Sequence, residues 1–190
     1  VYDRFGLLGE RSLFGHCIHL EEAELERLSA SRSVAVHCPT SNLFLGSGLM
    51  PWRELADAGI AVTLGSDIGA GTSLALPRVM ADAYKVAALL SGRLPAWQAL
   101  YAATRGGARA LGLEHEIGSF DTGTVADLAV WRWAVGPVAE ARDARAASLH
   151  ERVFAWMMLA DERNLRTTWV AGRPAYAADA AFAQFIASLW

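Results

Sequence analysis

The feature that most constrains the fold of this chain is an alternation of short apolar runs with helical stretches between residues 12 and 112. Three of the apolar runs have the length of buried strands: Ser12–Cys17, Ser33–His37 and Gly59–Asp67. Consecutive strands separated by helices run parallel, because each helix returns the chain to the edge from which the previous strand started. The sequence therefore predicts an α/β fold built on a parallel sheet.

Helices are expected between these strands and after them. Their predicted ranges are Glu21–Ser31, Trp52–Ala58, Leu76–Ser91 and Pro95–Leu111. In the segment that follows the second strand, residues 38–51, two prolines and two glycines interrupt any regular pattern. We therefore expect this segment to be a loop.

Beyond Gly112 the pattern changes to that of a small β region. Strands are expected over Leu128–Trp133 and Thr167–Val170, and a helix is expected to begin near Ser148. The predicted organisation is thus an α/β part over residues 1–112, a mixed region over residues 113–175 and a C-terminal helix over residues 176–190.

Composition and charge exclude several classes of partner. The chain has 17 Lys and Arg against 20 Asp and Glu and no basic block, so neither nucleic acid nor an anionic membrane is expected as a partner. No apolar stretch reaches the roughly 18 residues of a membrane-spanning helix. Cys17 and Cys38 are expected to be buried, reduced thiols of a cytoplasmic protein. Because the sequence opens with Val1 and not with methionine, we expect it to come from a longer chain.

A polar residue ends each of the three predicted strands: His16, His37 and Asp67. Ligands of α/β proteins bind at the carboxyl ends of the strands, so these side chains can converge on one bound atom. His16 is either a proton shuttle or metal ligand, or a packed core histidine. Asp67 is either a metal ligand and base or the N-cap of the next helix, and His37 is either a site residue or a packed histidine.

Two other patterns are weaker indications of function. Gly69-Ala70-Gly71 follows a strand, but position 74 is leucine where a dinucleotide fingerprint requires its third glycine, so nucleotide binding is a lower alternative. His16 and Cys17 are expected to point to opposite faces of their strand, which argues against a shared structural zinc ion.

Six segments of the sequence resemble, in order, the C-terminal part of the guanine deaminases, a family of the amidohydrolase superfamily. They are DRFGLLGERSLFGHCIHL, HCPTSNLFLGSGL, LGSDIGAGTS, AYKV, ATRGGARALGL and IGSFDTGTVADLAV. Related chlorohydrolases and deaminases share some of these segments. The resemblance extends over essentially the whole chain.

The resemblance implies a (β/α)8 barrel with a small β-sandwich, of which this chain supplies about strands six to eight and part of the sandwich. It also implies one zinc ion that activates a water for attack on guanine, with xanthine and ammonia as products. His16 matches the histidine that contacts this water or assists proton transfer, and Asp67 matches the aspartate that binds the metal and accepts a proton. His37 and Ser66 are expected to contact the substrate or the residues that bind it.

Two departures from the family pattern modify these expectations. Ala70 stands where the pattern has glycine, which is acceptable if the backbone φ is negative. The His-x-His pair, the further histidine and the glutamate of the family have no counterpart in these 190 residues. We therefore expect a fragment that is inactive alone. The full-length parent enzyme is expected to be a homodimer that acts on a small purine substrate. A related hydrolase or a truncated, non-catalytic interaction module are the alternatives.

Overall fold

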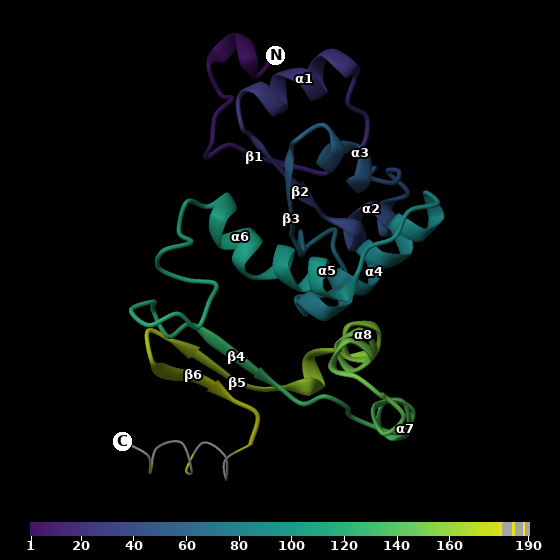
Figure 1. Cartoon of the computed structure of the whole chain (residues 1–190), viewed down its shortest axis with the longest axis vertical. Coiled ribbons are helices and arrows are strands. Elements are labelled where there is room, and N and C mark those ends of the chain that lie inside the picture. The colour runs from purple at the N-terminus through teal and green to yellow at the C-terminus, as the bar shows by residue number, and fades with distance from the viewer. Residues whose placement is uncertain (180–183, 185–187, 189–190) are drawn as a thin grey trace.

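The α/β part of the chain is built on a three-stranded parallel sheet (Figure 1). In the computed structural model, which describes residues 1–179, 184 and 188, the strands are β1 (Leu13–Gly15), β2 (Val34–His37) and β3 (Ala61–Leu64). β2 lies in the centre and pairs in parallel with both neighbours. The predicted α/β class and strand direction are therefore confirmed, although β1 and β3 end before the polar residues that were expected to close them.

One or more helices follow each strand of this sheet. They are α1 (Glu22–Ala30), α2 (Pro39–Leu45), α3 (Trp52–Asp57), α4 (Leu76–Leu89), α5 (Ala96–Ala103) and α6 (Arg105–Ala110), after a short 3-10 turn at Asp3–Phe5. One apolar cluster contains Leu28 of α1, Ala35 of β2 and Leu55 of α3. A second cluster joins α4 and α5 to the region beyond residue 112. The predicted helices at residues 21–31, 52–58 and 76–91 are confirmed with shorter ends.

The expected loop over residues 38–51 was wrong in its first half, because Pro39–Leu45 form α2. Pro39 occupies the first turn, where its missing N–H costs no hydrogen bond. Gly46 ends the helix with a left-handed φ of 67°, a conformation that glycine adopts without strain. The residues that were expected to break a helix therefore mark its two ends.

The single helix expected from Pro95 to Leu111 is two helices, α5 and α6, separated at Thr104. Thr104 has φ −129° and ψ −100°, far from helical values, and its Oγ1 donates to the carbonyl of Leu100 across 2.7 Å. A β-carbon at Gly106 would lie 2.9 Å from the carbonyl oxygen of Tyr101, so this tight junction needs glycine.

Beyond residue 112 the structure has an antiparallel sheet and two helices. The elements are β4 (Leu128–Trp131), α7 (Pro137–Asp143), α8 (Leu149–Leu159), a 3-10 turn at Glu162–Asn164, β5 (Leu165–Val170) and β6 (Arg173–Ala177), with the strand order β4-β5-β6. The predicted start of α8 is confirmed, because the Ser148 side chain accepts a hydrogen bond from the backbone N–H of Glu151. α7 and β6 were not predicted.

The expected C-terminal helix over residues 176–190 is corrected at its start, where Tyr176 and Ala177 belong to β6. β6 pairs with β5 after a turn at Ala171 and Gly172, both with positive φ. After the turn, β6 runs back along β5, and its hydrogen bonds with β5 hold these residues as a strand. Most of the remaining range lies outside the described residues.

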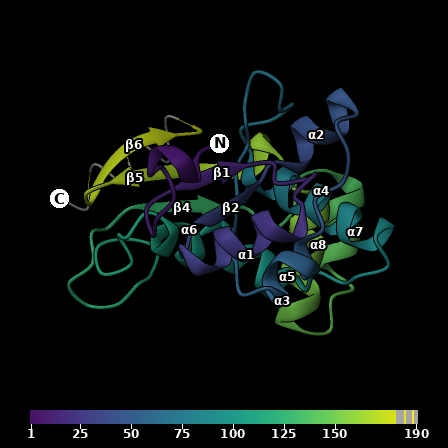
Figure 2. The ribbon, with the colours of Figure 1, turned by 90° about the horizontal axis from the view of Figure 1, so that it is seen from above.

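The two parts of the chain meet through α8, which packs against α4 and α5 (Figures 1 and 2). Met157 of α8 is fully buried in one cluster with Met80 of α4 and Ala99 of α5. The antiparallel sheet lies beyond α6, at the end of the molecule opposite α1 and the N-terminus (Figure 1). Among the helices that the structure describes, none is long and apolar enough to span a membrane.

Candidate active site

The structure brings His16 and Asp67 together, although the strands that precede them are not neighbours. β2 lies between β1 and β3, so the two outer strands are about 10 Å apart. The side chains nevertheless converge, and His16 Nε2 lies 3.9 Å from Asp67 Oδ2. Both residues follow their strands with positive φ, 71° for His16 and 47° for Asp67. These turned backbones direct the side chains over the end of β2.

The distance between the His16 imidazole and the Asp67 carboxylate leaves both groups able to bind a third molecule or ion. At 3.9 Å the contact is too long for a direct hydrogen bond. The side chains are 47% and 39% exposed, so a small molecule can reach them. One imidazole nitrogen and one carboxylate oxygen thus face a common, accessible space.

Hydrogen bonds from β2 and α2 hold His16 in place. Its backbone N–H donates to the carbonyl of Val36 across 2.9 Å. Its Nδ1 is 2.9 Å from Nδ2 of Asn42, which is buried on α2. Sequence reasoning missed Asn42, because residues 38–51 were expected to be a loop. Pro39 at the first turn of α2 is the signal that could have predicted a helix there.

A tight turn after β3 holds Asp67. The carbonyl of Asp67 accepts a hydrogen bond from the backbone N–H of Gly71 across 2.6 Å. A β-carbon at Gly71 would lie 1.8 Å from the carbonyl oxygen of Ser66, so the turn closes only around glycine. Ala70 is not among the residues with positive φ, and its methyl group is therefore accommodated without backbone strain.

His37 lies outside the accessible site, and its expected contact with substrate, or with the residues that bind substrate, stays a prediction. Its side chain is 1% exposed and packs edge-on against Trp52, with ring centroids 5.8 Å apart. Burial lowers its pKa to about 4, and its Nδ1 has no hydrogen-bond partner. This environment favours the alternative of a packed strand-end histidine. Ser66 is half-buried beside Asp67, and its proposed contact with substrate stays a prediction.

The two cysteines are buried and free, as expected. Burial, and secondarily the neighbouring Cys38, raise the pKa of the Cys17 thiol to about 11, so it carries its proton at neutral pH. His16 and Cys17 do not alternate between the faces of a strand as expected, because both have positive φ and lie beyond β1.

The donor set of the site fits part of a zinc centre. Carboxylate oxygen and imidazole nitrogen are ordinary zinc donors, and Asp67 offers a half-exposed carboxylate. A tight zinc site uses three or four protein ligands. In the described part of the chain, no group of three or more His, Cys, Asp or Glu residues is arranged to hold a metal ion. Asp67 can therefore serve as one ligand, and further ligands must join it.

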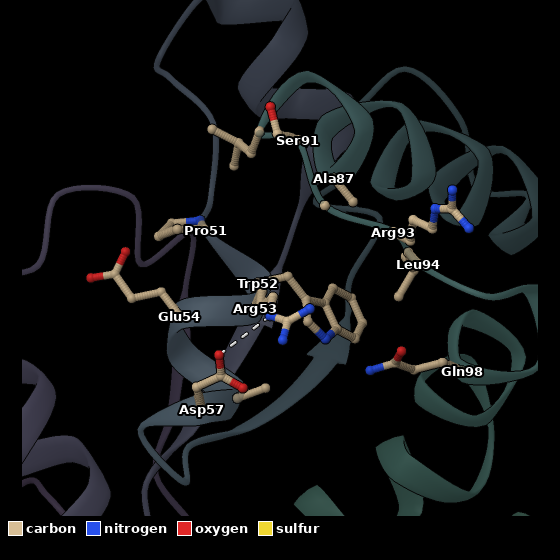
Figure 3. A pocket seen from close by; sticks show the side chains of 13 residues that line it. Pro51, Trp52, Arg53, Glu54, Asp57, Ala87, Ser91, Arg93, Leu94 and Gln98 are labelled. Atoms are coloured by element: carbon tan, nitrogen blue, oxygen red, sulfur yellow. Dashed lines mark ion pairs between the residues drawn. The ribbon is translucent and has the colours of Figure 1, made fainter.

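Two cavities of the described structure lie outside this site. One, of about 690 Å³, lies between α3 and the junction of α4 and α5 (Figure 3). Arg53 and Asp57 form an ion pair of 3.4 Å on its α3 side, and Gln98 extends from α5 toward Trp52. Another, of about 450 Å³, lies between β1 and α1 and is mainly apolar. Neither is lined by His16 or Asp67.

Comparison with known proteins connects this geometry to one family. Residues 1–175 match the amidohydrolase family. The chain is 43% identical to the guanine deaminase of Escherichia coli (strain K12) over 176 residues, which cover 93% of this chain and 40% of that protein. A solved structure of E. coli guanine deaminase is similar with a TM-score of 0.91 and 42% identity, over 94% of this chain and 42% of that chain.

Two other solved structures extend the comparison. Guanine deaminase from C. acetobutylicum, with guanine bound in its active site, has a TM-score of 0.79 and 34% identity, over 92% of this chain and 42% of that chain. An adenosine deaminase from Xanthomonas campestris with bound zinc has a TM-score of 0.78 and 30% identity, over 98% of this chain and 42% of that chain. The chain thus spans about two fifths of the length of the relatives it matches.

Proposed function

This chain belongs to the amidohydrolase family, and we propose that it supplies two reacting groups of a zinc-dependent enzyme that deaminates guanine to xanthine and ammonia. One observation carries the proposal: His16 Nε2 and Asp67 Oδ2 approach to 3.9 Å from strands that are not neighbours. A carboxylate and an imidazole at one accessible point can accept and donate the protons that hydrolytic deamination requires. The likeness to guanine deaminases supports guanine as the substrate.

In this proposal Asp67 holds the metal and accepts a proton from the attacking water. A zinc ion held there would supply a more acidic water as the nucleophile. His16 faces the same space and donates a hydrogen bond or a proton on the substrate side. Ser66 precedes Asp67 in the same turn and is proposed to contact the substrate.

We also propose the larger architecture that this site requires. β1, β2 and β3 are taken as strands six to eight of a (β/α)8 barrel, and β4, β5 and β6 as part of a small β-sandwich. The remaining zinc ligands then come from outside the described residues, so these 190 residues alone are expected to be inactive. The parent enzyme is proposed to be a cytoplasmic homodimer, and the two free cysteines support the reducing compartment.

The test uses the native protein that carries this sequence, at whatever length it occurs. Loaded with zinc, it is expected to release ammonia and xanthine from guanine, and chelation of the metal is expected to abolish the release. Asp67→Asn keeps the shape of the side chain but removes the base, and should lower kcat at least about 10²-fold. Failure of the zinc-loaded native protein to act on guanine would reject the assignment.

A different amino-substituted heterocycle is the second candidate substrate. The zinc-bound adenosine deaminase is nearly as similar in fold as one of the guanine deaminases, with TM-scores of 0.78 and 0.79. An ammonia-release assay on adenine, adenosine and other amino-heterocycles separates the candidates. The non-catalytic alternative is decided by the mass of the native species, because a native protein near 20 kDa without activity would favour it.

A further inference from the structure

The hydrogen bond between Asn42 and His16 constrains which ring nitrogen of His16 carries the proton. Asn42 Nδ2 and His16 Nδ1 are 2.9 Å apart. An amide nitrogen is a donor and not an acceptor, so Nδ1 must accept. A neutral imidazole has one N–H, and when Nδ1 accepts, the proton is on Nε2.

Nε2 is also the atom of His16 that faces Asp67, at 3.9 Å from Oδ2. A nitrogen that carries a proton has no free lone pair to give to a metal ion or to accept a proton. We propose that Asn42 is a positioning residue, which holds His16 in the tautomer with its proton on Nε2. His16 is then the hydrogen-bond donor of the site and Asp67 the acceptor. This inference deepens the proposed function and rests on it for its catalytic meaning.

Backbone hydrogen bonds and burial fix the position of Asn42, so that it can determine the tautomer of His16. Its backbone N–H donates to the carbonyl of Cys38 across 3.1 Å, and its carbonyl accepts from the N–H of Ser47 across 3.0 Å. Its side chain is enclosed, because the residue is only 3% exposed. The amide therefore has little freedom to turn away from His16.

α2 also contacts the segment that carries Asp67. Thr40, two residues before Asn42, donates from Oγ1 to the carbonyl of Ser66 across 3.3 Å. One short helix thus reaches the imidazole of His16 through Asn42 and the backbone next to Asp67 through Thr40. The spacing between the donor and the acceptor of the site is set by this helix as well as by the sheet.

The amide of Asn42 does not satisfy all of its own hydrogen-bonding groups. Its Oδ1 is buried without a hydrogen-bond partner, and an unsatisfied buried acceptor is unfavourable. Leucine has the same branched arrangement of side-chain heavy atoms but is larger than asparagine, and it would remove this unpaired atom together with the donor to His16. Asn42→Leu therefore serves to remove the donor to His16 Nδ1, and circular dichroism checks that the variant folds.

The test is the tautomer itself, measured on the native protein that carries this sequence, with ¹⁵N-labelled histidine and free of metal and substrate. Long-range ¹H–¹⁵N correlation at about pH 8.5, well above the ordinary imidazole pKa, distinguishes a protonated ring nitrogen from an unprotonated one. His16 is assigned by loss of its signals in His16→Gln. The expected result is Nε2 protonated and Nδ1 unprotonated. A proton on Nδ1 in the unsubstituted chain would overturn the proposal.

Variants make the test sharper. An ionised aspartate only accepts, so Asn42→Asp should place a proton on Nδ1, and Asn42→Leu should allow both tautomers. Ser41→Ala is the matched control, because Ser41 is equally buried on α2 but bonds to the carbonyl of Cys38. It should leave the tautomer unchanged. An unaltered His16 tautomer in both Asn42 variants, folded as judged by circular dichroism, would also contradict the proposal.

A kinetic measurement on the native holoenzyme gives the catalytic consequence. Asn42→Asp is expected to lower kcat about 10–100-fold with little change in KM, because residue 42 is buried and acts through His16. The two proposals can fail separately. A correct tautomer with no action on guanine rejects the substrate and keeps Asn42, whereas activity with a proton on Nδ1 rejects the role of Asn42 alone.

Discussion

At the scale of single residues, the environment gives two histidines of neighbouring strands different roles. His16 and His37 each end a strand segment in the sequence, and their types alone do not separate them. His16 turns out of the sheet with positive φ and stays half-exposed beside Asp67. His37 is the last residue of β2 and is buried against Trp52. A difference in backbone conformation at one residue thus decides which imidazole is accessible.

The burial of His37 predicts a pH dependence of stability. Its pKa is about 4 in the folded chain because of burial, against an ordinary value of 6.5. The unfolded chain therefore takes up a proton at higher pH than the folded chain does, and stability falls as pH decreases from about 6.5 to 4. The full effect is on the order of 3 kcal/mol. Urea unfolding at a series of pH values measures it.

The variant His37→Phe is the control for this pH dependence, and the titration of Asp161 falls in a different pH range. His37→Phe retains an aromatic ring against Trp52 and removes the titrating group, so its stability should be flat between pH 6.5 and 4. Hydrogen bonds from Arg163 lower the pKa of Asp161 from the ordinary 3.8 to about 2. The contribution of Asp161 to folding stability is therefore lost as pH falls from about 3.8 to 2, in His37→Phe as in the unsubstituted chain. The same slope in the variant and the unsubstituted chain would show that His37 is not the cause.

At the scale of elements, the turn between β3 and α4 positions Asp67. Gly71→Ala would place a methyl group 1.8 Å from the carbonyl oxygen of Ser66, and this backbone atom cannot move away as a flexible side chain can. We expect the turn to open and the chain to lose about 1–3 kcal/mol of stability. The distance between His16 and Asp67 should also increase. Chemical denaturation and a structure of the variant measure these two effects.

Ala70→Gly is the matched control in the same turn. Ala70 has no positive φ, so glycine relieves no strain there and only adds freedom to the unfolded chain. We expect a loss of about 0.5–1 kcal/mol and an unchanged position of Asp67. If Gly71→Ala were as mild as Ala70→Gly, close packing of backbone atoms would not be what shapes this turn.

At the scale of the whole molecule, one apolar cluster joins the α/β part to the region beyond residue 112. Met157 of α8 is fully buried in it, together with Met80 of α4 and Ala99 of α5. The ion pair between Arg78 and Asp161, 3.2 Å long, links the same two regions. Because this core is shared, we expect the two regions to unfold in one cooperative transition.

Met157→Ala tests this coupling. Emptying the space of a fully buried methionine is expected to cost about 2–5 kcal/mol. Amide hydrogen exchange should then show reduced protection in β2 as well as in β5, although Met157 lies in neither strand. Leu159→Ala on the same helix is the control, because Leu159 is exposed and its change should stay within about 0.5 kcal/mol. Loss of protection confined to β5 would indicate two independent units.

The sequence by itself determined the elements that depend on local pattern. Apolar runs of strand length predicted the parallel sheet, Ser148 predicted the start of α8, and the polar ends of the first and third strands predicted the meeting of His16 with Asp67. These features follow from the short-range periodicity of side chains and from the rule that parallel strands end at one edge.

Only the tertiary structure decided the features that depend on contacts between distant residues. The burial of His37 against Trp52 arises from packing that no local pattern records. Asn42 is the clearest case, because its partner His16 lies 26 positions away. An amide on a helix becomes part of a site only when the fold places an imidazole beside it, and that placement is a property of the packed chain.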